Sequence, residues 1–320
     1  MSDVHWADLS DLWQHPGLKP TDLFATAGSC FAQHIGRYLA RQDCGYLDME
    51  PPPSFLNEKA ATSNGFGIYS CRYGNVYTTR QLRQLMEEAF GDRATADIAW
   101  EREGRWFDAM RPSVDPAGHA SAKMVYALRI PHLARVRKMF ESLNVFVFTL
   151  GLTEVWESVD GGTAFPSAPG VIAGSFDSAK YALRLLRHDE CLEDLEYVRS
   201  KLHDVNPSAR MILTVSPVPL VATATDEHVL PATMQSKSTL RSVAGEMARH
   251  HDDVAYFPSY EIIAAHPGRA TFFEADLRTV NAAGVRYVMS HFFNGWLDIS
   301  SDKSEVDEYE VICDEEAVDT

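Results

Sequence analysis

The sequence has little that would hold the chain in a membrane. Its longest apolar runs, around residues 144–152 and 211–221, are far shorter than the about 20 residues that a spanning helix needs. The N-terminus shows no basic region followed by an apolar stretch, so the sequence predicts no secretory signal peptide. We therefore expect a chain that neither inserts into a membrane nor leaves the cytoplasm.

Positive charge and paired cysteines are scarce as well. The formal net charge of −16 argues against nonspecific binding to nucleic acid or to anionic lipid. The five cysteines are odd in number and scattered, with no Cys-x-x-Cys pair and no Cys/His cluster at zinc-site spacing. We expect thiols in a reducing, cytoplasmic compartment, no metal and no required cofactor. The sequence leaves the oligomeric state open.

Half of the acidic excess lies at the C-terminus. Residues 301–320 hold nine acidic side chains against Lys303 alone, a net charge of −8. Such a run is typical of a disordered, solvated tail, and an acidic interaction tail is the alternative. We expect one domain over residues 1–300, followed by this tail.

Short apolar runs alternate with helical patterns along the chain. Runs rich in β-branched and aromatic residues predict strands at 22–29, 144–151, 210–217 and 254–259. Apolar spacings of three and four predict helices at 32–42, 180–202, 232–250 and 282–297. This alternation predicts an α/β domain of three layers, with helices on both faces of a mostly parallel sheet.

Segment 51–118 breaks the alternation. It begins with three consecutive prolines and contains many glycines. We interpret it as an insertion of long loops with one helix over 78–90, rather than as a second domain.

The end of the first predicted strand carries the best candidate nucleophile. In open parallel sheets, ligands bind beyond the carboxyl ends of the strands. Here the strand ends in Gly28-Ser29-Cys30, at the predicted start of a helix. A helix N-terminus stabilises a thiolate, which makes Cys30 suited to nucleophilic attack. The alternative is a buried, inert cysteine, and the spacing alone favours that alternative.

Two glycine-rich turns are candidates for hydrogen-bond donors at the same edge. Asn64 and Gly67 lie in an Asn-Gly-Phe-Gly turn that could present an amide or a backbone N–H, although it could equally be an ordinary turn. After the second predicted strand, Gly151 permits close backbone approach and Thr153 can donate a hydrogen bond, as an oxyanion hole requires. Glu154 could contact substrate or complement a helix dipole.

A proton acceptor is harder to place among the twelve histidines. His228, near Asp226, lies in the loop after the third predicted strand and is the leading candidate. His34 lies one helical turn beyond Cys30 and could touch it. Asp276, before the last predicted helix, could orient a histidine or simply stabilise that helix N-terminus.

Several segments of the sequence resemble a known family. ATAGSCFAQHIGRYLA resembles the signature of the GSCFA family, with the five letters GSCFA at 28–32. Further blocks resemble the same family over most of residues 22–297, among them SCRYGNVYTTRQL (70–82), VFVFTLGLTEVW (145–156) and SKSTLRSVAGEM (236–247). The resemblance implies a flavodoxin-like, three-layer SGNH-type fold, shared with esterases and acyltransferases. Many such proteins are bacterial and are related by context to surface polysaccharides.

The SGNH pattern fits these residues unevenly. Cys30 stands where that pattern has its serine nucleophile, and Gly67 is the closest match to the glycine that supplies an N–H. Gly151 to Glu154 match the Gly-x-Asn-Asp block with threonine and glutamate substituted. Asp276 matches the aspartate of Asp-x-x-His, but Thr279 stands in place of the histidine. The base must therefore come from elsewhere, or the site binds without turnover.

The resemblance implies two functions of different classes. The first is an acyl-transfer enzyme, an O-acyl esterase or O-acyltransferase acting on a carbohydrate, with acyl-CoA as one donor substrate. Cys30 attacks the acyl carbonyl. The Cys30 N–H, the Gly67 N–H and Thr153 hold the oxyanion. His228 moves the proton and is oriented by Asp226 or Asp276. Ser29 is a further candidate nucleophile. The second function is a catalytically degenerate module that binds carbohydrate or acyl-CoA.

Overall fold

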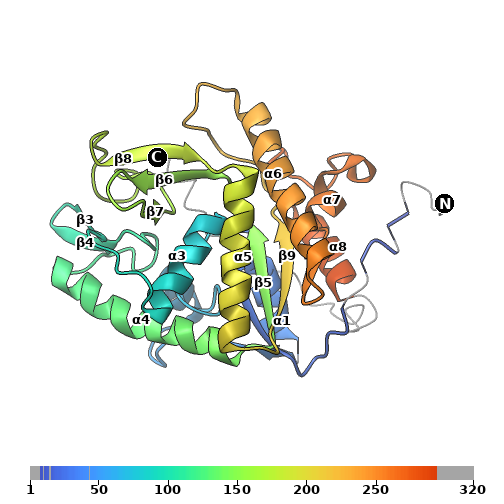
Figure 1. Cartoon of the computed structure of the whole chain (residues 1–320), viewed down its shortest axis with the longest axis horizontal. Helices are drawn as coiled ribbons and strands as arrows, with labels where there is room; N and C mark the ends of the chain where they lie inside the picture. Colours follow the sequence, from blue (N-terminus) through green and yellow to red (C-terminus); the bar gives the residue numbers. More distant parts are fainter. Residues whose placement is uncertain (1–7, 10, 14–15, 43, 294–320) are drawn as a thin grey trace.

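The computed structural model describes residues 8–9, 11–13, 16–42 and 44–293. Five parallel strands form the central sheet, in the order β2-β1-β5-β9-β10 (Figure 1). They are β1 (Leu23–Gly28), β2 (Gly45–Tyr46), β5 (Val145–Leu150), β9 (Arg210–Val215) and β10 (Val254–Phe257). Counted along the chain, this is the order 2-1-3-4-5 of flavodoxin-like folds. The predicted α/β class and parallel sheet are confirmed.

The side chains of the strands alternate between two hydrophobic clusters, one on each face. In β5, Val145 and Val147 pack on one face, whereas Phe146 and Phe148 pack on the other. In β9, Ile212 likewise lies on the face opposite its neighbours. Because successive side chains of a strand point to opposite faces, a strand that is covered on both must be apolar throughout. This is why these strands are readable as continuous apolar runs.

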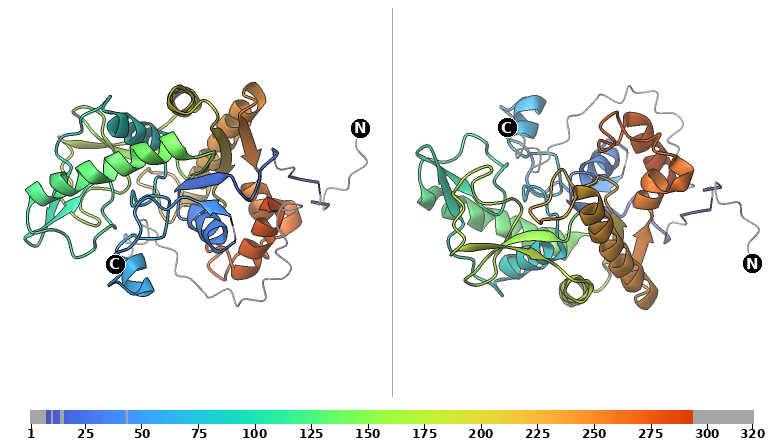
Figure 2. Two further views of the ribbon diagram at one scale, coloured as in Figure 1. Left: turned by 90° about the horizontal axis from the view of Figure 1, so that it is seen from below. Right: turned by 90° about the horizontal axis from the view of Figure 1, so that it is seen from above.

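Helices cover both faces of the sheet, and this confirms the predicted three layers (Figure 2). One face is covered by α1 (Ala32–Arg41), α7 (Ser259–Ala264) and α8 (Ala282–Phe292). The other face is covered by α3 (Thr79–Phe90), α4 (Ala122–Ser142), α5 (His188–Val205) and α6 (Val229–His250). No helix within the described residues is both long and apolar enough to cross a membrane.

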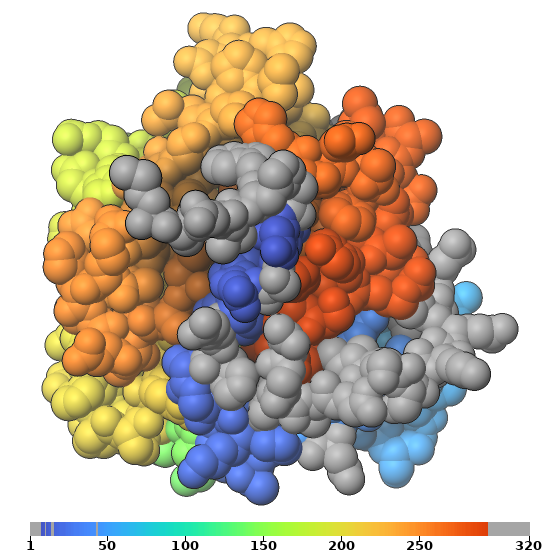
Figure 3. All heavy atoms as spheres, turned by 90° about the vertical axis from the view of Figure 1, so that its right-hand side faces the viewer, coloured from blue at the N-terminus to red at the C-terminus, as the bar shows by residue number. Residues whose placement is uncertain are grey.

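Helix α8 packs its aromatic side chains into the core, as its spacing predicts. Val288, Met289 and Phe292 are fully buried. Trp13, from the N-terminal segment, stacks on Phe292, and its indole N–H donates to the Phe292 carbonyl. Figure 3 shows this N-terminal segment in blue beside the orange-red α8. The predicted end of the helix at 297 and the tail at 301–320 lie outside the described residues.

The predicted helix over 180–202 is wrong in its first third. Tyr181–Leu185 form strand β8, which pairs antiparallel with β6 (Glu154–Ser158), and α5 begins only at His188. With β7 (Ala164–Phe165), these strands make a separate small sheet. The spacing of four between Tyr181 and Leu185 fits a helix by coincidence, since Leu185 is exposed. The acidic first turn of α5 marks the true start.

Segment 51–118 contains more regular structure than its composition predicts. The helix predicted over 78–90 is present as α3, which starts with a capping box between Thr78 and Gln81. A short helix, α2 (Glu58–Ser63), and a hairpin of β3 (Ala99–Arg102) and β4 (Arg105–Asp108) were not predicted. The strands of the hairpin have only four residues each, too few for a periodic signal.

Candidate active site

The strand order of the sheet reverses between β1 and β5. The place where the carboxyl ends of these two strands lie side by side is called the crevice below. From β1 the chain passes through α1 to β2 on one side, whereas β9 lies on the other side of β5. Ligands bind at such a switch point in open parallel sheets. Ser29 and Cys30 follow β1 at this point, and Gly151, Leu152 and Thr153 follow β5. The structure therefore brings two of the predicted site segments to one edge.

The turn after β1 is fixed against β5. Gly28 has a φ of +138°, and a Cβ there would lie 2.4 Å from the Thr149 carbonyl oxygen, so only glycine fits. The Ser29 N–H donates to the same carbonyl at 3.0 Å. The Gln33 N–H then donates to the Cys30 carbonyl at 3.1 Å and starts the first turn of α1. The position of Cys30 is thus set by main-chain hydrogen bonds on both sides.

Cys30 lies one residue before Phe31, the N-cap of α1, and is a thiol rather than half of a disulfide. Backbone N–H groups and the helix dipole stabilise a thiolate at such a position. Cys30 is also only 6% exposed, as an inert core cysteine would be. Position and burial therefore point to different roles, and a measurement of reactivity separates them.

Ser29, the other candidate nucleophile, has no base beside it. It is 3% exposed, and its Oγ is buried without a hydrogen-bond partner among the described residues. A serine hydroxyl is activated by an adjacent general base, whereas a thiol is a few per cent ionised near neutrality and needs less help. This difference favours Cys30.

Gly151 packs directly on the turn that carries the nucleophile. A Cβ at Gly151 would lie 2.9 Å from Ser29 Cβ and 3.0 Å from the Tyr77 carbonyl oxygen. That carbonyl accepts the N–H groups of Gly151 and Leu152, at 2.9 and 3.0 Å. The Gly151 carbonyl in turn accepts a hydrogen bond from the buried Lys237 Nζ at 2.8 Å. The close backbone approach predicted for Gly151 is thus made with Ser29 and Tyr77, and both of its main-chain polar groups are used.

Thr153 and Glu154 join the end of β5 to two other segments. The N–H of the buried Thr153 donates to Ser236 Oγ of α6 at 3.0 Å. Glu154 opens β6, and its carboxylate accepts hydrogen bonds from Thr223 Oγ1 at 2.7 Å and from the Ala224 N–H at 3.4 Å. Thr153 therefore has its hydroxyl, not its N–H, to offer an oxyanion, and Glu154 ties down the loop before α6. Their roles toward a substrate stay predictions.

Asn64 and Gly67 differ in what they can offer a ligand. The Asn64 amide donates to the Ala60 carbonyl at 2.8 Å and closes the C-terminus of α2. Gly67 is exposed, has a φ of +66°, and has no atom within 4 Å of where a Cβ would lie. Because the Asn64 amide is engaged within α2, Gly67 stays the predicted oxyanion donor of the two.

An asparagine that sequence reasoning did not single out lies against the nucleophile turn. The Tyr69 hydroxyl, which has one proton to donate, lies 3.1 Å from the Ser29 carbonyl oxygen and 2.5 Å from Asn75 Oδ1. Gln33 Nε2, from the first turn of α1, donates to the same oxygen at 3.3 Å. All four side chains are buried. This network supports the Ser29–Cys30 turn through the Ser29 carbonyl and the first turn of α1.

The two candidate histidines have local roles. His228 is exposed and is the N-cap of α6, where its Nδ1 accepts the Leu230 N–H at 3.1 Å. The His34 ring packs edge-on against Phe31, and burial, with Arg37 adding to the effect, lowers its pKa to about 3. So low a pKa makes His34 a weak base at pH 7. The proton-shuttle role of His228 stays a prediction.

Asp276 is occupied by its own loop. Its carboxylate accepts the N–H groups of Arg278 and Thr279 and the Thr279 hydroxyl, the last at 2.6 Å. Both Asp276 and Thr279 are exposed. The two positions of the Asp-x-x-His block thus bond to each other, and the threonine satisfies the aspartate that a histidine would otherwise contact.

The sequence blocks contained the missed residues but did not mark them. Tyr77 and Asn75 belong to the block at 70–82, and Ser236 and Lys237 begin the block at 236–247. The resemblance pointed to these blocks, whereas the local pattern of Lys237 is that of an ordinary helix surface. Lysine is almost never fully buried, so its position in the core could not be expected from its type.

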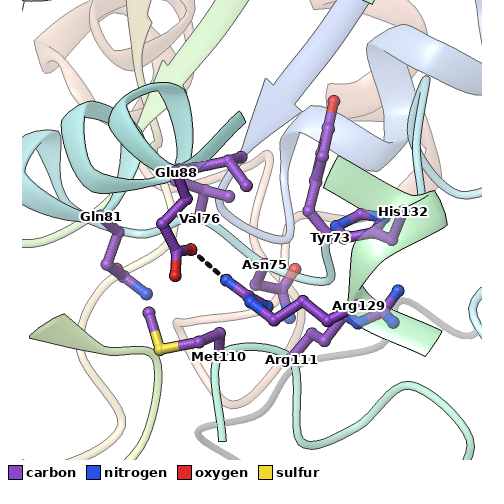
Figure 4. Close-up of a pocket in the computed structure, with 10 residues that line it drawn as sticks. Tyr73, Asn75, Val76, Gln81, Glu88, Met110, Arg111, Arg129 and His132 are labelled. Carbon is purple, nitrogen blue, oxygen red and sulfur yellow. Dashed lines mark hydrogen bonds and ion pairs between the residues drawn. The ribbon is translucent and has the colours of Figure 1, made fainter. Parts of the chain in front are cut away.

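A charged cavity of about 20 Å³ lies beyond Asn75, between α3 and α4 (Figure 4). Its lining includes Asn75, Gln81, Glu88, Arg111, Arg129 and His132. Figure 4 shows the ion pair between Glu88 and Arg129. The space suffices for one water molecule. Across residues 8–293, as far as they are described, no three His, Cys, Asp or Glu side chains gather to hold a metal ion.

A second, apolar cavity of about 220 Å³ is lined by Tyr77 and by Gln81, which also lines the charged cavity. Its walls come from the end of β5, from β6, from segment 165–171 and from the loop before α6. They include Tyr77, Leu152, Trp156, Phe165, Val171 and Leu220. Several lining residues, such as Leu152 and Trp156, are partly exposed, so the cavity reaches the surface.

Comparisons with known proteins agree with the motifs. No curated protein matches the chain. Among solved structures, the chain is similar to a putative GDSL-like lipase from Parabacteroides merdae ATCC 43184, at 13% sequence identity and a TM-score of 0.34. That alignment covers 88% of this chain and 97% of the other. The model of the GSCFA family matches residues 23–292, and the chain belongs to the GSCFA family.

Proposed function

We propose that this chain is an acyl-transfer enzyme, an O-acyl esterase or O-acyltransferase, with Cys30 as its nucleophile. The observation that carries the proposal is the placement of Cys30 at the N-terminus of α1, in the crevice between β1 and β5. Family membership supports it, since the GSCFA signature resembles the nucleophile block of SGNH hydrolases. The apolar cavity beside the same crevice gives a substrate room to bind.

The proposed reaction proceeds in two steps. The Cys30 thiolate attacks the acyl carbonyl, the carbon–oxygen bond to the alcohol breaks, and a thioester forms while the alkoxide takes up the proton that the thiol released. Water or a sugar hydroxyl then attacks the thioester, giving an acid or a new ester and restoring the thiol. Water as acceptor makes the enzyme an esterase, and a sugar makes it an acyltransferase.

Three donors are proposed for the oxyanion that forms in each step. They are the Cys30 N–H at the start of α1, the Gly67 N–H and the Thr153 hydroxyl. The exposed, left-handed backbone of Gly67 supports its inclusion. The hydrogen bond from the Thr153 N–H to Ser236 Oγ holds Thr153 in place and leaves the Thr153 hydroxyl for the substrate.

His228 is proposed as the proton shuttle. While its Nδ1 accepts the Leu230 N–H, the neutral ring carries its proton on Nε2 and has no lone pair to accept another. His228 must leave its cap before it can act as a base. A thiolate depends less on a base than an alkoxide does, which fits a chain with Thr279 at the usual histidine position.

A carbohydrate as the acyl acceptor and acyl-CoA as a donor are parts of the proposal that the family resemblance alone supports. The rival function is a module that binds such ligands without turnover. The hydrogen bond between Thr279 and Asp276 favours that rival, because it closes the position where SGNH enzymes hold their histidine.

Acyl trapping tests the proposal. The protein is incubated with 4-nitrophenyl acetate, and peptides are mapped by mass spectrometry. We expect an acetyl group on Cys30, absent in Cys30→Ala and retained in the matched control Cys44→Ala. Acetylation of Ser29 instead would transfer the role to that residue. No acetylation at either position, with intact folding shown by circular dichroism, would leave the binding module as the function.

A further inference from the structure

The apolar cavity shares walls with the nucleophile crevice. Tyr77 lines the cavity, and its Cδ1 lies 3.2 Å from the position that a Cβ on Gly151 would take. Ser29 Cβ lies 2.9 Å from that same position, on the side of the crevice that carries Cys30. Leu152, directly after Gly151, also lines the cavity. The cavity wall at Tyr77 and Leu152 thus packs on Gly151 and, through Gly151, against the turn that carries Cys30.

Polar atoms in the cavity wall are engaged within the protein at Glu154 and Gln81, whereas the buried Ser167 Oγ has no hydrogen-bond partner among the described residues. Glu154 accepts hydrogen bonds from Thr223 and from the main chain after it. Gln81 Oε1 accepts the N–H groups of Tyr77 and Thr78. A sugar in this space would bury hydroxyl groups with few partners, and each such loss is costly. The wall suits a hydrocarbon group instead.

We propose that this cavity is the acyl-chain site of the enzyme, for an uncharged aliphatic or aromatic acyl group of roughly six to nine carbon atoms. This inference rests on the proposed function. The size follows from volume, because a dry apolar cavity of about 150 Å³ holds benzene, and this one measures about 220 Å³. The Glu154 carboxylate in the wall disfavours an anionic acyl group.

Turnover of a chain-length series tests the site. We would measure kcat/KM for 4-nitrophenyl acetate, butyrate, hexanoate, benzoate and dodecanoate. Each buried methylene should raise kcat/KM roughly fourfold up to the hexanoate, and the dodecanoate should fall, because it exceeds the cavity. Ala168→Trp, which fills the cavity, should lower kcat/KM for the hexanoate at least tenfold more than it lowers kcat/KM for the acetate. Ala179→Trp, at an exposed position outside the cavity, is the matched control.

A binding measurement separates this inference from the proposed function. In Cys30→Ala, hexanamide should raise the melting temperature, acetamide should not, and Ala168→Trp should abolish the rise. Hexanamide binding without turnover of any ester would support the apolar site and overturn the enzyme. Turnover with no chain-length preference and no hexanamide binding would overturn the acyl-chain site and leave the enzyme intact. A maltooligosaccharide that binds here in place of hexanamide would also overturn the acyl-chain site.

Discussion

The charged and apolar cavities lie on either side of Gln81, whose side chain lines both, yet they differ in almost every property. The charged cavity has room for about one water, and its ionic side chains are engaged with one another: Arg129 with Glu88 and Asp108, and Arg111 with Asp108. The apolar cavity is about ten times larger and holds few groups that could bind a polar ligand.

The comparison shows that a cluster of charged residues is not by itself a ligand site. The carboxylates and guanidinium groups around the charged cavity pair with one another while buried, although Arg129 Nε has no hydrogen-bond partner among the described residues. These ion pairs link segments 72–111 and 129–132. Burial alone would raise the pKa of Asp108, but Arg129 and Arg111 hold it at about 2. Room, apolar walls and nearness to a nucleophile mark the other cavity as the one that takes a substrate.

Removal of Arg129 should have the largest effect, and it tests whether the charged cavity is structural. Arg129→Met leaves the buried Glu88 without its ion-pair partner and leaves Asp108 with Arg111 alone, and we expect a loss of about 3–5 kcal/mol in the free energy of unfolding. Urea denaturation measures it. Arg137→Met, on the exposed face of the same helix, should cost less than about 1 kcal/mol. Equal effects of the two would show that the network does not stabilise the fold.

His132 should make the stability pH-dependent. Burial, aided by Arg111, lowers its pKa to about 4 from an ordinary value of 6.5, although Glu50 opposes the shift. Below pH 6.5 the unfolded ring takes up a proton while the folded ring stays neutral. Stability is therefore complete above pH 6.5 and is lost as the pH falls toward 4, by on the order of 3 kcal/mol.

His132→Gln isolates this contribution, because His34, which also has a lowered pKa, remains in both proteins. We expect a flatter dependence of the free energy of unfolding on pH between 6.5 and 4.5 than in the wild type. The exposed His203→Gln on α5 is the control and should keep the wild-type slope. A His132→Gln slope equal to that of the wild type would contradict the assignment.

Removal of Glu154 should have the smallest effect on stability and should act mainly on the apolar cavity. Glu154→Ala removes the acceptor for Thr223 and Ala224 and frees the loop that forms one wall. We expect KM for 4-nitrophenyl hexanoate to rise several-fold, with a stability loss of about 1 kcal/mol. Glu154→Gln keeps an acceptor oxygen, so its KM should lie between that of the wild type and that of Glu154→Ala. An unchanged KM in Glu154→Ala would show that the loop does not shape the site.

Four of the five strands of the sheet could be predicted, because burial makes them apolar, whereas the two half-buried residues of β2 carry no such signal and were not predicted. Continuous apolar runs such as 145–150 and 210–215 carry that information locally. The small sheet could not be predicted, because β7 has only two residues and the partly exposed β6 and β8 depend on their partners. Tyr181–Leu185 satisfied a helical spacing, and pairing with β6 overrode it.

The candidate site divides in the same way. The glycines and the cysteine at the strand ends are visible in sequence, because turns at a sheet edge need them. Asn75, Tyr77 and Lys237 reach the crevice from a loop and from the inner face of α6, and only the fold shows that they meet there. His228 was predicted as the base for Cys30 from its place after the third predicted strand. That place along the chain does not reveal that the His228 side chain caps α6.

The reactivity of the cysteines tests the central claim most directly. Cys44 is more exposed than Cys30, and burial raises the pKa of Cys191 to about 12 and that of Cys71 well above its usual range. Exposure alone therefore ranks Cys44 first among these four. Peptide mapping of iodoacetamide labelling over time, at pH 7, gives a rate for each thiol. If the N-terminus of α1 activates Cys30, it labels faster than Cys44 and faster than every other cysteine; if Cys44 labels first, Cys30 is a structural residue and the proposed nucleophile is wrong.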